Sequence, residues 1–503
     1  MIILDKKVDK LFIMYNPQRE RAFIGENLVV YDQSLSIKPN GVVAQIIEER
    51  PYVPYGMQES LLLESLAPEV QVTTTMEELG ATRSELRNQK LLISKIRLSA
   101  QTDEDGRVTF LKPWNGWSPT PGCKVVKLTD EEVLRFIDLE GKSGKTANLG
   151  KTLGGASFNL NLYYLHGVTV FIGGRNTGKS HLAKKLALRL IDEGKKLIVF
   201  DINDEWSAMR FVKATSSSEP DKSPYYDKIV KVDPGVNMGF ELGYLGKQVF
   251  IAVLKAMKME ETSASMQTAL NLWNTLKMKG QLTLENLKAG IQSTEQDRVK
   301  EALLTRINQL EGSGIITKSG KGVTIESLLN GEKLKNGGLL VVNLKDKTVI
   351  TQFIIVQLFI TKLANILSEP TNPSLVLILE EAQLYMDHSD IQEIVTRLRH
   401  LGLHQMYITN NPQSLPTFLL SHITNWFIFN LINDQDIQYL SNSLPLDLDS
   451  ANTFIKMLPP RNTLVLINEM YMGQSKNYPI IVQVEPLPYQ TAGATREPTF
   501  TFG

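Results

Sequence analysis

From about residue 166 onward, short runs of aliphatic and β-branched residues alternate with longer stretches in which apolar residues recur at helical spacing. The short runs have the length of buried strands, and the stretches between them are long enough to return over a sheet. The predicted strands lie at 168–172, 197–201, 339–343, 374–379, 405–409, 426–430 and 463–467. This pattern predicts an α/β fold with a mostly parallel sheet.

The first 150 residues show a different pattern. Short apolar runs such as LVVYD and GVVAQIIEE are separated by glycine, proline and asparagine turn signals, as in a small β-barrel or sandwich. Two stretches at 56–95, MQESLLLESL and EELGATRSELRNQKLLISKI, have helical spacing. The sequence therefore predicts an N-terminal β-barrel domain at 1–150 with a helical insertion.

The remaining boundaries follow from changes of pattern. Between 244 and 335 the chain is mainly helical and rich in lysine, which predicts a helical subdomain inserted into the α/β domain. The two parts of that domain then cover 151–243 and 336–478. The last residues, 479–503, predict a strand followed by a tail rich in proline and glycine.

Charge and composition narrow the function classes. Lysine plus arginine and aspartate plus glutamate each number 54, so no whole-chain field draws the protein onto nucleic acid, and any DNA contact is expected to be local. The single cysteine, Cys123, fits a reducing cytosol, and we expect it to be a small core residue. Polar residues interrupt the apolar runs near the N-terminus and at 348–367, so we expect neither segment to anchor the protein in a membrane. The segment 348–367 is expected to be a buried helix, and the protein to be cytoplasmic.

A phosphate-binding loop is predicted at 173–180, where GGRNTGKS fits the pattern G-x-x-x-x-G-K-[ST] between a strand and an amphipathic helix. Glycines let backbone N–H groups approach phosphates, and a helix N-terminus favours negative charge. The expected nucleotide-binding residues are Gly173, Gly174, Arg175, Asn176, Thr177, Gly178, Lys179, Ser180 and His181. Lys179 is expected to contact the β and γ phosphates of ATP, and Ser180 to ligate Mg²⁺. The alternative is a glycine-rich turn that matches by chance.

The predicted strand at 374–379 ends in two carboxylates, Glu380 and Glu381. In ATPase sheets of this class such a strand lies beside the phosphate loop. Glu380 is therefore expected to orient the water shell of Mg²⁺, and Glu381 to polarise the attacking water. The alternative is an ordinary charged start of a helix.

Polar residues around the neighbouring strands are further candidates. Asn410 and Asn411 follow the strand at 405–409 and would contact the γ-phosphate or water, or else form a turn with the following proline. Arg397 and Arg399 would stabilise charge across a subunit boundary, or else be solvated surface residues.

Asp201 and Glu205 emerge at the carboxyl end of the strand at 197–201. Because α/β sheets bind ligands at this edge, both would border the nucleotide or a nucleic-acid channel. The alternative is that they cap the following segment.

These motifs together resemble the HerA branch of the HerA/FtsK ATPase superfamily. The resemblance runs through LHGVTVFIGGRNTGKS, LIVFDINDEW, LVLILEEAQ, TRLRHLGLHQMYITNNPQSLP and PLPYQTAGATRE, over roughly residues 160–500. It implies a RecA-like P-loop ATPase domain with an inserted helical subdomain, preceded by a small barrel. It also implies a homohexameric ring with ATP at subunit interfaces, double-stranded DNA through the centre and a partner docked on the barrel face. In the family that partner is often a nuclease for DNA end processing, and in antiphage operons another effector, including a sirtuin-like NAD hydrolase.

The sequence departs from the family pattern at two site positions. The family usually has Asp where Glu380 stands and Gln where Asn410 stands, so metal geometry and sensing of the γ-phosphate are expected to differ. Arg399 aligns with the arginine that follows the acidic strand in the family. Arg496, in the tail, is a second residue expected to reach a neighbour's nucleotide.

The first functional hypothesis is therefore a hexameric, ATP-hydrolysing DNA translocase or helicase-like motor that acts with a partner. The alternative is a nucleotide-gated oligomeric scaffold that activates an effector with little translocation, which Glu380 and Asn410 would permit. A small-molecule kinase is disfavoured by the barrel, the long insertion and the acidic pair.

Two sets of residues are candidates for macromolecular contacts. The basic residues expected to grip DNA phosphates are Lys318, Lys321, Arg210 and Lys213. The alternative for each is a solvated surface charge. Trp114 and Trp117, in KPWNGWSPTPG, would anchor a partner, or else cover the barrel's own core.

Overall fold

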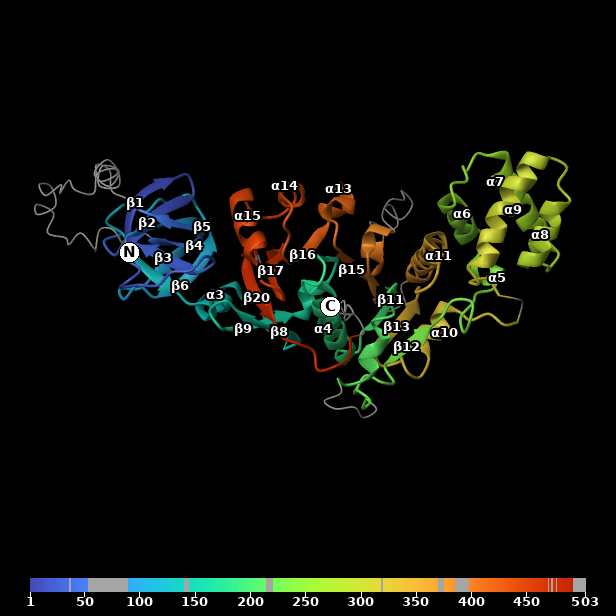
Figure 1. The fold of residues 1–503 in the computed structure, drawn as a ribbon, viewed down its shortest axis with the longest axis horizontal. Helices are drawn as coiled ribbons and strands as arrows, with labels where there is room; N and C mark the ends of the chain where they lie inside the picture. The colour runs from blue at the N-terminus through green and yellow to red at the C-terminus, as the bar shows by residue number, and fades with distance from the viewer. Residues whose placement is uncertain are drawn as a thin grey trace, which may run out of the picture. The chain divides into compact units, whose positions relative to one another are not determined.

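The computed structural model gives the fold of this 503-residue chain, which Figure 1 shows as a ribbon. The residues it describes are 1–35, 38–52, 89–139, 144–213, 220–317, 320–369, 375–384, 398–468, 470–471, 474–475 and 477–491. The chain divides into two units: unit 1 comprises Met1–Asn161 and Asn430–Val484, and unit 2 comprises Leu162–Phe429 and Glu485–Gly503. This division differs from the predicted domains, because Asn430–Val484 associates with the N-terminal part.

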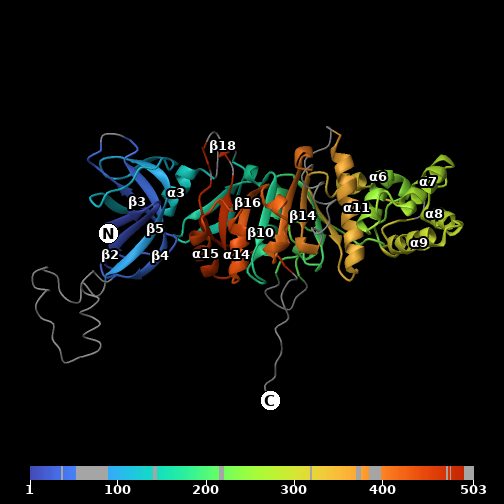
Figure 2. The same ribbon diagram turned by 90° about the horizontal axis from the view of Figure 1, so that it is seen from above.

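The N-terminal part of unit 1 is an antiparallel sheet. Its strands are β1 (Ile2–Lys7), β2 (Lys10–Tyr15), β3 (Asn27–Tyr31), β4 (Gly41–Pro51), β5 (Lys90–Thr102), β6 (Val108–Pro113) and β7 (Lys124–Leu128). They follow the order β1-β2-β5-β4-β3-β7, and β6 pairs with β5. Figure 2 labels β2, β3, β4 and β5 of this sheet. Leu11, Ile13, Val42 and Ala44 belong to a buried core that also contains Cys123. The sheet fits the predicted small N-terminal barrel, and Cys123 is the expected core residue.

The helix predicted at the end of 56–95 is wrong over its last residues. The run KLLISKI is strand, because β5 begins at Lys90 and pairs with both β2 and β4. The apolar residues of this run fit both helical and strand spacing. Pairing with the neighbouring strands β2 and β4 therefore decides that the run forms a strand. The predicted insertion from 56 to 88 lies outside the described residues.

The remainder of unit 1 joins two distant stretches of sequence. Its elements are α3 (Asp130–Ile137), β8 (Thr146–Thr152), β9 (Ser157–Asn161), α14 (Asp434–Ser441), α15 (Leu448–Met457), β17 (Asn462–Ile467), β18 (Met470–Tyr471), β19 (Gln474–Ser475) and β20 (Ile480–Val484). The strands β17, β20, β8 and β9 are neighbours in that order and antiparallel. The pairing of β20 with β8 explains why Asn430–Val484 belongs to the N-terminal unit.

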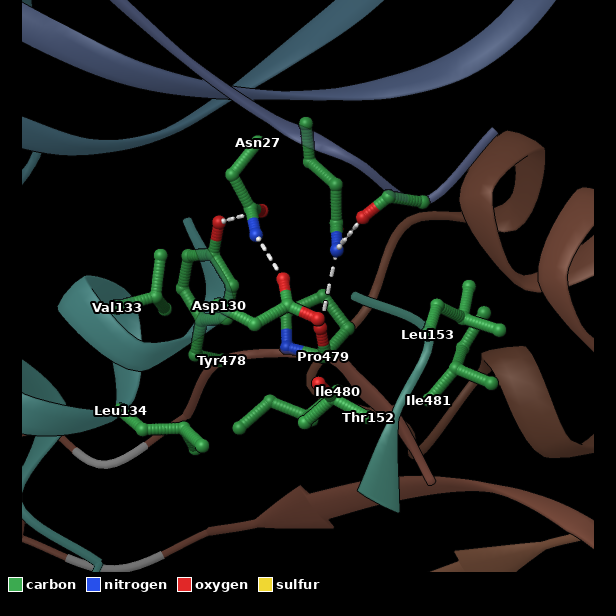
Figure 3. Close-up of a pocket in the computed structure, with 12 residues that line it drawn as sticks. Asn27, Asp130, Val133, Leu134, Thr152, Leu153, Tyr478, Pro479, Ile480 and Ile481 are labelled. Atoms are coloured by element: carbon green, nitrogen blue, oxygen red, sulfur yellow. Dashed lines mark hydrogen bonds between the residues drawn. The ribbon is translucent and has the colours of Figure 1, made fainter. Parts of the chain in front are cut away.

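Figure 3 shows where the segment before β20 meets the N-terminal sheet, around a cavity of about 20 Å³. Tyr478 donates its hydroxyl hydrogen to Asn27 Oδ1 at 2.6 Å, and Asn27 donates through Nδ2 to Asp130 Oδ1 at 3.0 Å. Gln45 donates through Nε2 to the carbonyl oxygen of Pro479 at 3.1 Å. These bonds hold the segment against β3 and β4.

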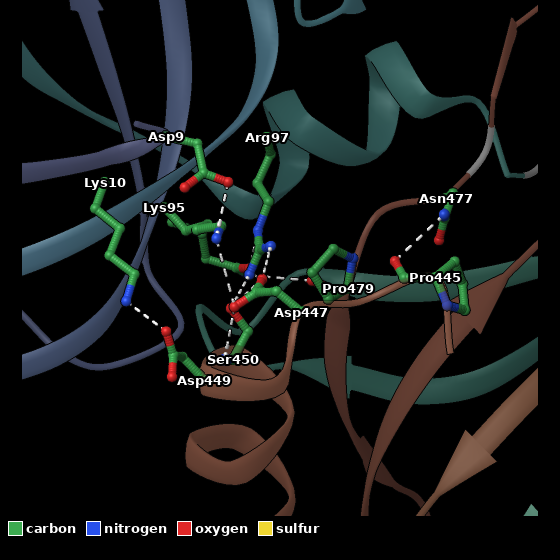
Figure 4. Close-up of polar contacts among 11 residues, drawn as sticks. Asp9, Lys10, Lys95, Arg97, Pro445, Asp447, Asp449, Ser450, Asn477 and Pro479 are labelled. Carbon is green, nitrogen blue, oxygen red and sulfur yellow. Dashed lines mark hydrogen bonds and ion pairs between the residues drawn. The ribbon is translucent and has the colours of Figure 1, made fainter. Parts of the chain in front are cut away.

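A charge cluster attaches α15 to β5 in the same unit (Figure 4). Arg97 donates to Asp447 Oδ2 at 3.1 Å and to Ser450 Oγ at 2.8 Å. Lys95 Nζ lies 2.8 Å from Asp9 Oδ2 and 3.6 Å from Asp447 Oδ1. Asp447 is also the N-cap of α15, where it accepts the Ser450 N–H at 3.0 Å. We refer to Asp9, Lys95, Arg97, Asp447 and Ser450 as the charge cluster.

Unit 2 is built on a parallel sheet. Its strands are β10 (Val168–Ile172), β11 (Lys196–Asp201), β12 (Ile229–Val232), β13 (Gly338–Asn343), β14 (Leu375–Leu379), β15 (Leu403–Thr409) and β16 (Ile423–Ile428). They follow the order β12-β13-β11-β14-β15-β10-β16. The predicted strands between 168 and 430 are all present, so the predicted α/β fold is confirmed. β12 was not predicted, because this four-residue strand, IVKV, contains a lysine and is buried only at its two ends.

Helices and short 3-10 turns connect these strands. They are η2 (Leu162–Leu165), α4 (Lys179–Asp192), η3 (Ser207–Arg210), α5 (Leu242–Leu245), α6 (Lys247–Ala256), α7 (Ala264–Met278), α8 (Leu284–Gln292), α9 (Asp297–Gly312), α10 (Ile325–Asn330), α11 (Val349–Leu367), η4 (Ala382–Leu384), η5 (Arg399–Leu401), η6 (Pro412–Ser414) and α13 (Thr417–Leu420). Helices α7, α8 and α9 pack together, and both α6 and α9 contact α11 (Figures 1 and 2). The predicted helical stretch at 244–335 thus consists of α5 to α10.

Helix α11 coincides with the apolar stretch at 348–367. Within the described residues it alone is long and apolar enough to cross a membrane, and 61% of its most apolar window is buried inside the protein. Its polar residues are also used internally, because Gln352 donates through Nε2 to the Leu344 carbonyl at 3.2 Å and Gln357 is fully buried. The predicted buried helix is confirmed.

Candidate functional site

The phosphate-binding loop lies between β10 and α4 of unit 2, as the sequence predicts. Gly173 has no space for a side chain, since a Cβ there would stand 2.5 Å from Phe429 Cβ. Asn176 and Gly178 adopt positive φ angles of 60° and 116°, and left-handed residues of this kind occur in loops whose successive backbone N–H groups bind anions. Gly178 is the N-cap of α4 and offers no side-chain cap, so the first N–H groups of the helix remain available to an anion.

Lys179 opens α4 and is folded back into the loop. Its Nζ donates to the carbonyl oxygen of Gly174 at 2.6 Å, and Thr177 Oγ1 donates to the same oxygen at 2.8 Å. Burial lowers the pKa of Lys179 to about 8, against the opposing effect of Glu381 and Glu380. A buried ammonium group that contacts a neutral carbonyl is suited to exchange this contact for a phosphate oxygen.

Glu380 directly follows β14, and its side chain is 2% exposed. Its Oε1 accepts a hydrogen bond from Ser180 Oγ at 3.2 Å, and its Oε2 accepts one from Trp206 Nε1 at 3.3 Å. Burial raises its pKa to about 8; Lys184 opposes this shift, whereas Asp201 and Glu205 add to it. The structure thus joins two predicted site residues, Ser180 and Glu380, which lie 200 positions apart.

Beside Glu380, a linked group of residues lies at the carboxyl end of β11. It consists of Lys184, Asp201, Glu205 and Trp206, and we call it the buried platform. Asp201 accepts the backbone N–H groups of Glu205 at 3.1 Å and Trp206 at 2.9 Å, and burial raises its pKa. Lys184 Nζ pairs with Glu205 Oε2 at 2.8 Å, with the lysine side chain 1% exposed. Of the two predicted roles for Asp201, the structure shows capping of the following segment.

Glu381 is held by a different set of side chains. Its backbone is left-handed, with φ of 49°, and its Oε2 accepts a hydrogen bond from Gln383 Nε2. Gln383 Oε1 in turn accepts from Thr409 Oγ1, at the end of β15, at 2.9 Å. Thr409 also accepts the N–H of Asn411 at 3.1 Å. Asn410 is half-buried between these two residues, and its contact with phosphate or water stays a prediction.

Sequence analysis did not identify Lys184, Trp206, Gln383 or Thr409. A weak signal exists for Trp206, which ends the motif LIVFDINDEW, and for Gln383, which ends LVLILEEAQ. Lys184 lies on the buried face of an amphipathic helix, where a lysine is uncommon unless it is paired. Of the four missed residues, Lys184 was therefore the one that the sequence could most readily have indicated.

The other predicted nucleotide-binding residues that the structure describes lie at the surface of the loop or face other parts of the chain. Arg175 and Asn176 are exposed on the loop. His181 Nε2 accepts the N–H of Leu487 at 3.2 Å, so this side chain faces the C-terminal segment. Arg496 and Arg397 lie outside the described residues, as does the side chain of Arg399, whose backbone belongs to η5.

Among the predicted DNA-contacting residues, Lys318 lies outside the described residues and Lys321 is exposed. Arg210 and Lys213 make internal contacts instead. The Arg210 guanidinium carbon lies 4.2 Å from the centre of the Tyr226 ring, and Lys213 Nζ donates to the Leu487 carbonyl at 2.8 Å.

Trp114 and Trp117 pack against the core of the N-terminal sheet. Trp114 Nε1 also donates to the Trp117 carbonyl at 2.9 Å. Of the two predicted roles, the structure shows that of covering the barrel's own core.

The described residues include no group of three or more histidine, cysteine, aspartate or glutamate side chains that could hold a metal ion. Mg²⁺ needs no such group, because it commonly binds one or two protein ligands, phosphate oxygens and water. The hydroxyl of Ser180 beside the carboxyl of Glu380 fits that requirement. The uncapped start of α4 and the Lys179 ammonium fit a phosphate chain.

Comparisons with known proteins agree with this geometry. Residues 177–364 match the family model described as the central domain of the helicase HerA. The matched range includes Lys179 and Ser180 and ends before the acidic strand. No curated protein matches the sequence significantly.

Among the solved structures that match, two illustrate the shared fold. VirB4 of Thermoanaerobacter pseudethanolicus is 14% identical, with a TM-score of 0.53, over 69% of this chain and 98% of that one. The plasmid coupling protein TrwB, in complex with the non-hydrolysable ATP analogue ADPNP, is 15% identical, with a TM-score of 0.50, over 73% of this chain and 94% of that one. The RecA-like P-loop fold is confirmed, and the match of residues 177–364 to the HerA central-domain model agrees with the motifs of the sequence.

Proposed function

We propose that this protein is an ATP-hydrolysing motor that assembles into a hexameric ring, translocates along double-stranded DNA and acts with a nuclease or another effector. DNA end processing and antiphage defence are the settings this proposal favours, within the cytoplasm. The observation that carries the ATPase assignment is the convergence of three residues at one edge of the parallel sheet. Lys179 and Ser180 begin α4, and Ser180 Oγ lies 3.2 Å from Glu380 Oε1.

Three further features support ATP with Mg²⁺ as the ligands. Backbone N–H groups at the start of α4 and the Lys179 ammonium would hold the phosphates. Ser180 would ligate the metal, and Glu380 would hold a water of its hydration shell. The TrwB structure with a similar fold contains an ATP analogue. Bound ATP and Mg²⁺ would supply the γ-phosphoryl group and neutralise its charge.

The chain's own residues would then divide the work of hydrolysis. Lys179 would leave the Gly174 carbonyl and donate to phosphate oxygens. Glu381 would accept a hydrogen bond from the attacking water and take its proton. Gln383 and Thr409 would keep the Glu381 carboxylate in place from the end of the neighbouring strand.

The assembly part of the proposal rests on residues beyond one subunit's site. Arg399 and Arg496 would stabilise charge at a neighbour's nucleotide, which requires a head-to-tail interface that closes into a ring. Lys318 and Lys321 would grip DNA phosphates, so affinity should fall steeply with salt and show little base preference. Residues 1–150 would serve as the docking platform for the effector.

The ATPase assignment is tested by two substitutions. Lys179→Ala removes the ammonium that holds phosphate, so ATP affinity should fall. Glu381→Gln keeps the shape of the site but removes the base, so ATP should bind normally while turnover falls about 100-fold or more. Turnover of Glu381→Gln at the wild-type rate would refute the role of the acidic strand.

A second candidate is a nucleotide-gated scaffold that activates an effector with little translocation. The observation favouring it is Glu380, one methylene longer than the family's Asp, whose two oxygens are already held by Ser180 and Trp206. Measuring turnover and mass with ATP, with and without double-stranded DNA, separates the two candidates. DNA-stimulated turnover by a six-fold assembly supports the motor, whereas assembly with slow turnover that DNA leaves unchanged supports the scaffold.

A further inference from the structure

Trp206 occupies a central place in the buried platform. Its side chain has no solvent exposure, and its indole nitrogen donates to Glu380 Oε2 at 3.3 Å. The Lys184 ammonium lies 5.6 Å from the centre of its ring and is paired with Glu205. The indole therefore lies close both to this ion pair and to the carboxylate that would hold the metal's water.

The backbone of Trp206 is itself held at the end of β11. Asp201 Oδ2 accepts its N–H at 2.9 Å, and Asp201 Oδ1 accepts the N–H of Glu205 at 3.1 Å. A side chain anchored in this way presents its N–H from a stable support. Because the indole occupies Oε2 of Glu380, the other oxygen, Oε1, is the one that faces Ser180.

Burial alone does not explain this hydrogen bond. Trp273 and Trp426 are also fully buried in unit 2, yet within the described part of the chain their indole N–H groups have no acceptor. This unit thus tolerates a buried tryptophan without an indole hydrogen bond. The bond of Trp206 is a feature of its place beside Glu380.

We propose that Trp206 is a positioning residue for the metal site, since its indole N–H holds Glu380 Oε2 and leaves Oε1 directed at the Ser180 hydroxyl and the metal's water. This inference rests on the proposed ATP and Mg²⁺ site. A carboxylate without this bond can rotate, so its contribution to metal binding becomes weaker. The Lys184 ammonium, paired with Glu205, lies over the indole ring.

The test measures how much Mg²⁺ strengthens ADP binding, which is a binding readout independent of turnover. In the wild-type protein the ADP dissociation constant is compared with and without Mg²⁺. Trp206→Phe should leave metal-free ADP binding unchanged and reduce the gain from Mg²⁺ about tenfold, the size expected for one hydrogen bond to a charged group. A wild-type protein that gains nothing from Mg²⁺ would refute the proposed site itself.

Trp426→Phe is the matched control. It removes the same atoms from another fully buried tryptophan of the same unit whose indole has no acceptor. We expect it to lower thermal stability while the Mg²⁺-dependent gain stays at the wild-type value. An equal loss of the gain in Trp426→Phe, or no loss in Trp206→Phe, would overturn the inference.

A double variant tests whether Trp206 acts through Glu380. Glu380→Gln should also reduce the gain from Mg²⁺, and adding Trp206→Phe should reduce it no further, because the carboxylate to be held is absent. Independent, additive losses would contradict the inference. If Trp206→Phe fails to bind metal-free ADP, benzothienylalanine at position 206 replaces the N–H by sulfur at nearly the same shape. A wild-type gain with that replacement would equally overturn the inference.

Discussion

The charge cluster of unit 1 and the phosphate site of unit 2 both bury carboxylates beside cations, but they balance these charges in opposite ways. Around Asp447, burial raises the pKa, yet the Ser450 N–H and Arg97 outweigh it and the net pKa is lowered. Around Glu380, burial dominates and raises the pKa to about 8. One carboxylate is fully compensated by its neighbours, and the other is not.

This difference matches two different roles: the charge cluster attaches α15 to the sheet, whereas the phosphate site is suited to bind a ligand. Arg97 donates to Gln45, Asp447 and Ser450, and its bonds to the last two hold α15 on the sheet. At the phosphate site, Lys179 contacts a neutral carbonyl and Glu380 contacts neutral donors, so each keeps its electrostatic need for a partner of opposite charge. Perturbed pKa values of this kind mark sites that a bound ligand completes.

Removal of Arg97 is expected to give the largest effect on stability. Arg97→Met leaves Asp447 without its main cation in a site that is 26% exposed, and should lower the free energy of unfolding by about 3 kcal/mol. Nucleotide binding by the folded protein should be unchanged, because the substitution lies in unit 1. Urea unfolding and ADP titration measure the two quantities.

The neighbouring pair of Lys10 and Asp449 offers the matched control. It attaches the same helix, but its side chains are 31% and 60% exposed. Lys10→Met should therefore cost about 0.5 kcal/mol or less. Equal losses for Arg97→Met and Lys10→Met would show that the charge cluster gains nothing from burial.

The second prediction concerns pH in the absence of nucleotide and metal. Glu380 has its pKa raised from 4.5 to about 8, so the folded state binds a proton that the unfolded state has lost, and stability should fall as pH rises between these values. The slope is about 1 kcal/mol per pH unit for one such group. Asp447, whose pKa is lowered from 3.8, contributes fully above that value and adds no slope here.

Thermal unfolding in EDTA between pH 5 and about 7 tests this prediction. The wild-type midpoint should fall across the range, while that of Glu380→Gln, which cannot ionise, should change much less. Arg97→Met should retain the wild-type slope at a lower midpoint. A slope in Glu380→Gln as steep as in the wild type would assign the effect to another group.

Local pattern predicted much of the fold and the core of the site. The strands of unit 2 are continuous apolar runs, and the phosphate loop is one uninterrupted motif, so both could be read without knowledge of distant contacts. The lysine-containing β12 and the start of β5 gave no such signal. Their strand conformation depends on pairing with β13 and with β2 and β4.

Contacts across long stretches of sequence could not be predicted. Trp206 and Glu380 are 174 positions apart, and Arg97 and Asp447 are 350 positions apart. No spacing rule joins such residues, because the order of strands in the sheet brings them together. For the same reason the sequence placed β17 in the α/β domain and β20 in the C-terminal segment 479–503, whereas the pairing of β20 with β8 groups both strands with unit 1.

The smallest expected effect concerns Glu381, which is held by neutral donors alone. Thr409→Val removes the hydroxyl that donates to Gln383 Oε1, so Gln383 loses its support and holds Glu381 less firmly. Because Glu381 itself remains, ATP turnover should fall only about tenfold, with the ATP dissociation constant unchanged. Gln383→Ala should give a loss of similar size, and the double variant should be no worse than either single one.

Thr424→Val is the control for this relay, by which we mean the hydrogen bonds from Thr409 to Gln383 and from Gln383 to Glu381. Thr424 is buried in β16 and donates to the backbone carbonyl of His166 at 3.0 Å, with no link to the acidic residues, so its loss should cost stability without lowering turnover per folded molecule. If Thr409→Val and Thr424→Val reduce turnover alike, the relay adds nothing beyond sheet stability. If only Thr409→Val does so, the site contains two independently supported carboxylates: Glu380 held from the end of β11, and Glu381 held from the end of β15. The charge cluster would then differ from the site in a second respect. In the cluster a carboxylate is held by a cation, Arg97. In the site each carboxylate is oriented by a neutral donor, which does not neutralise it.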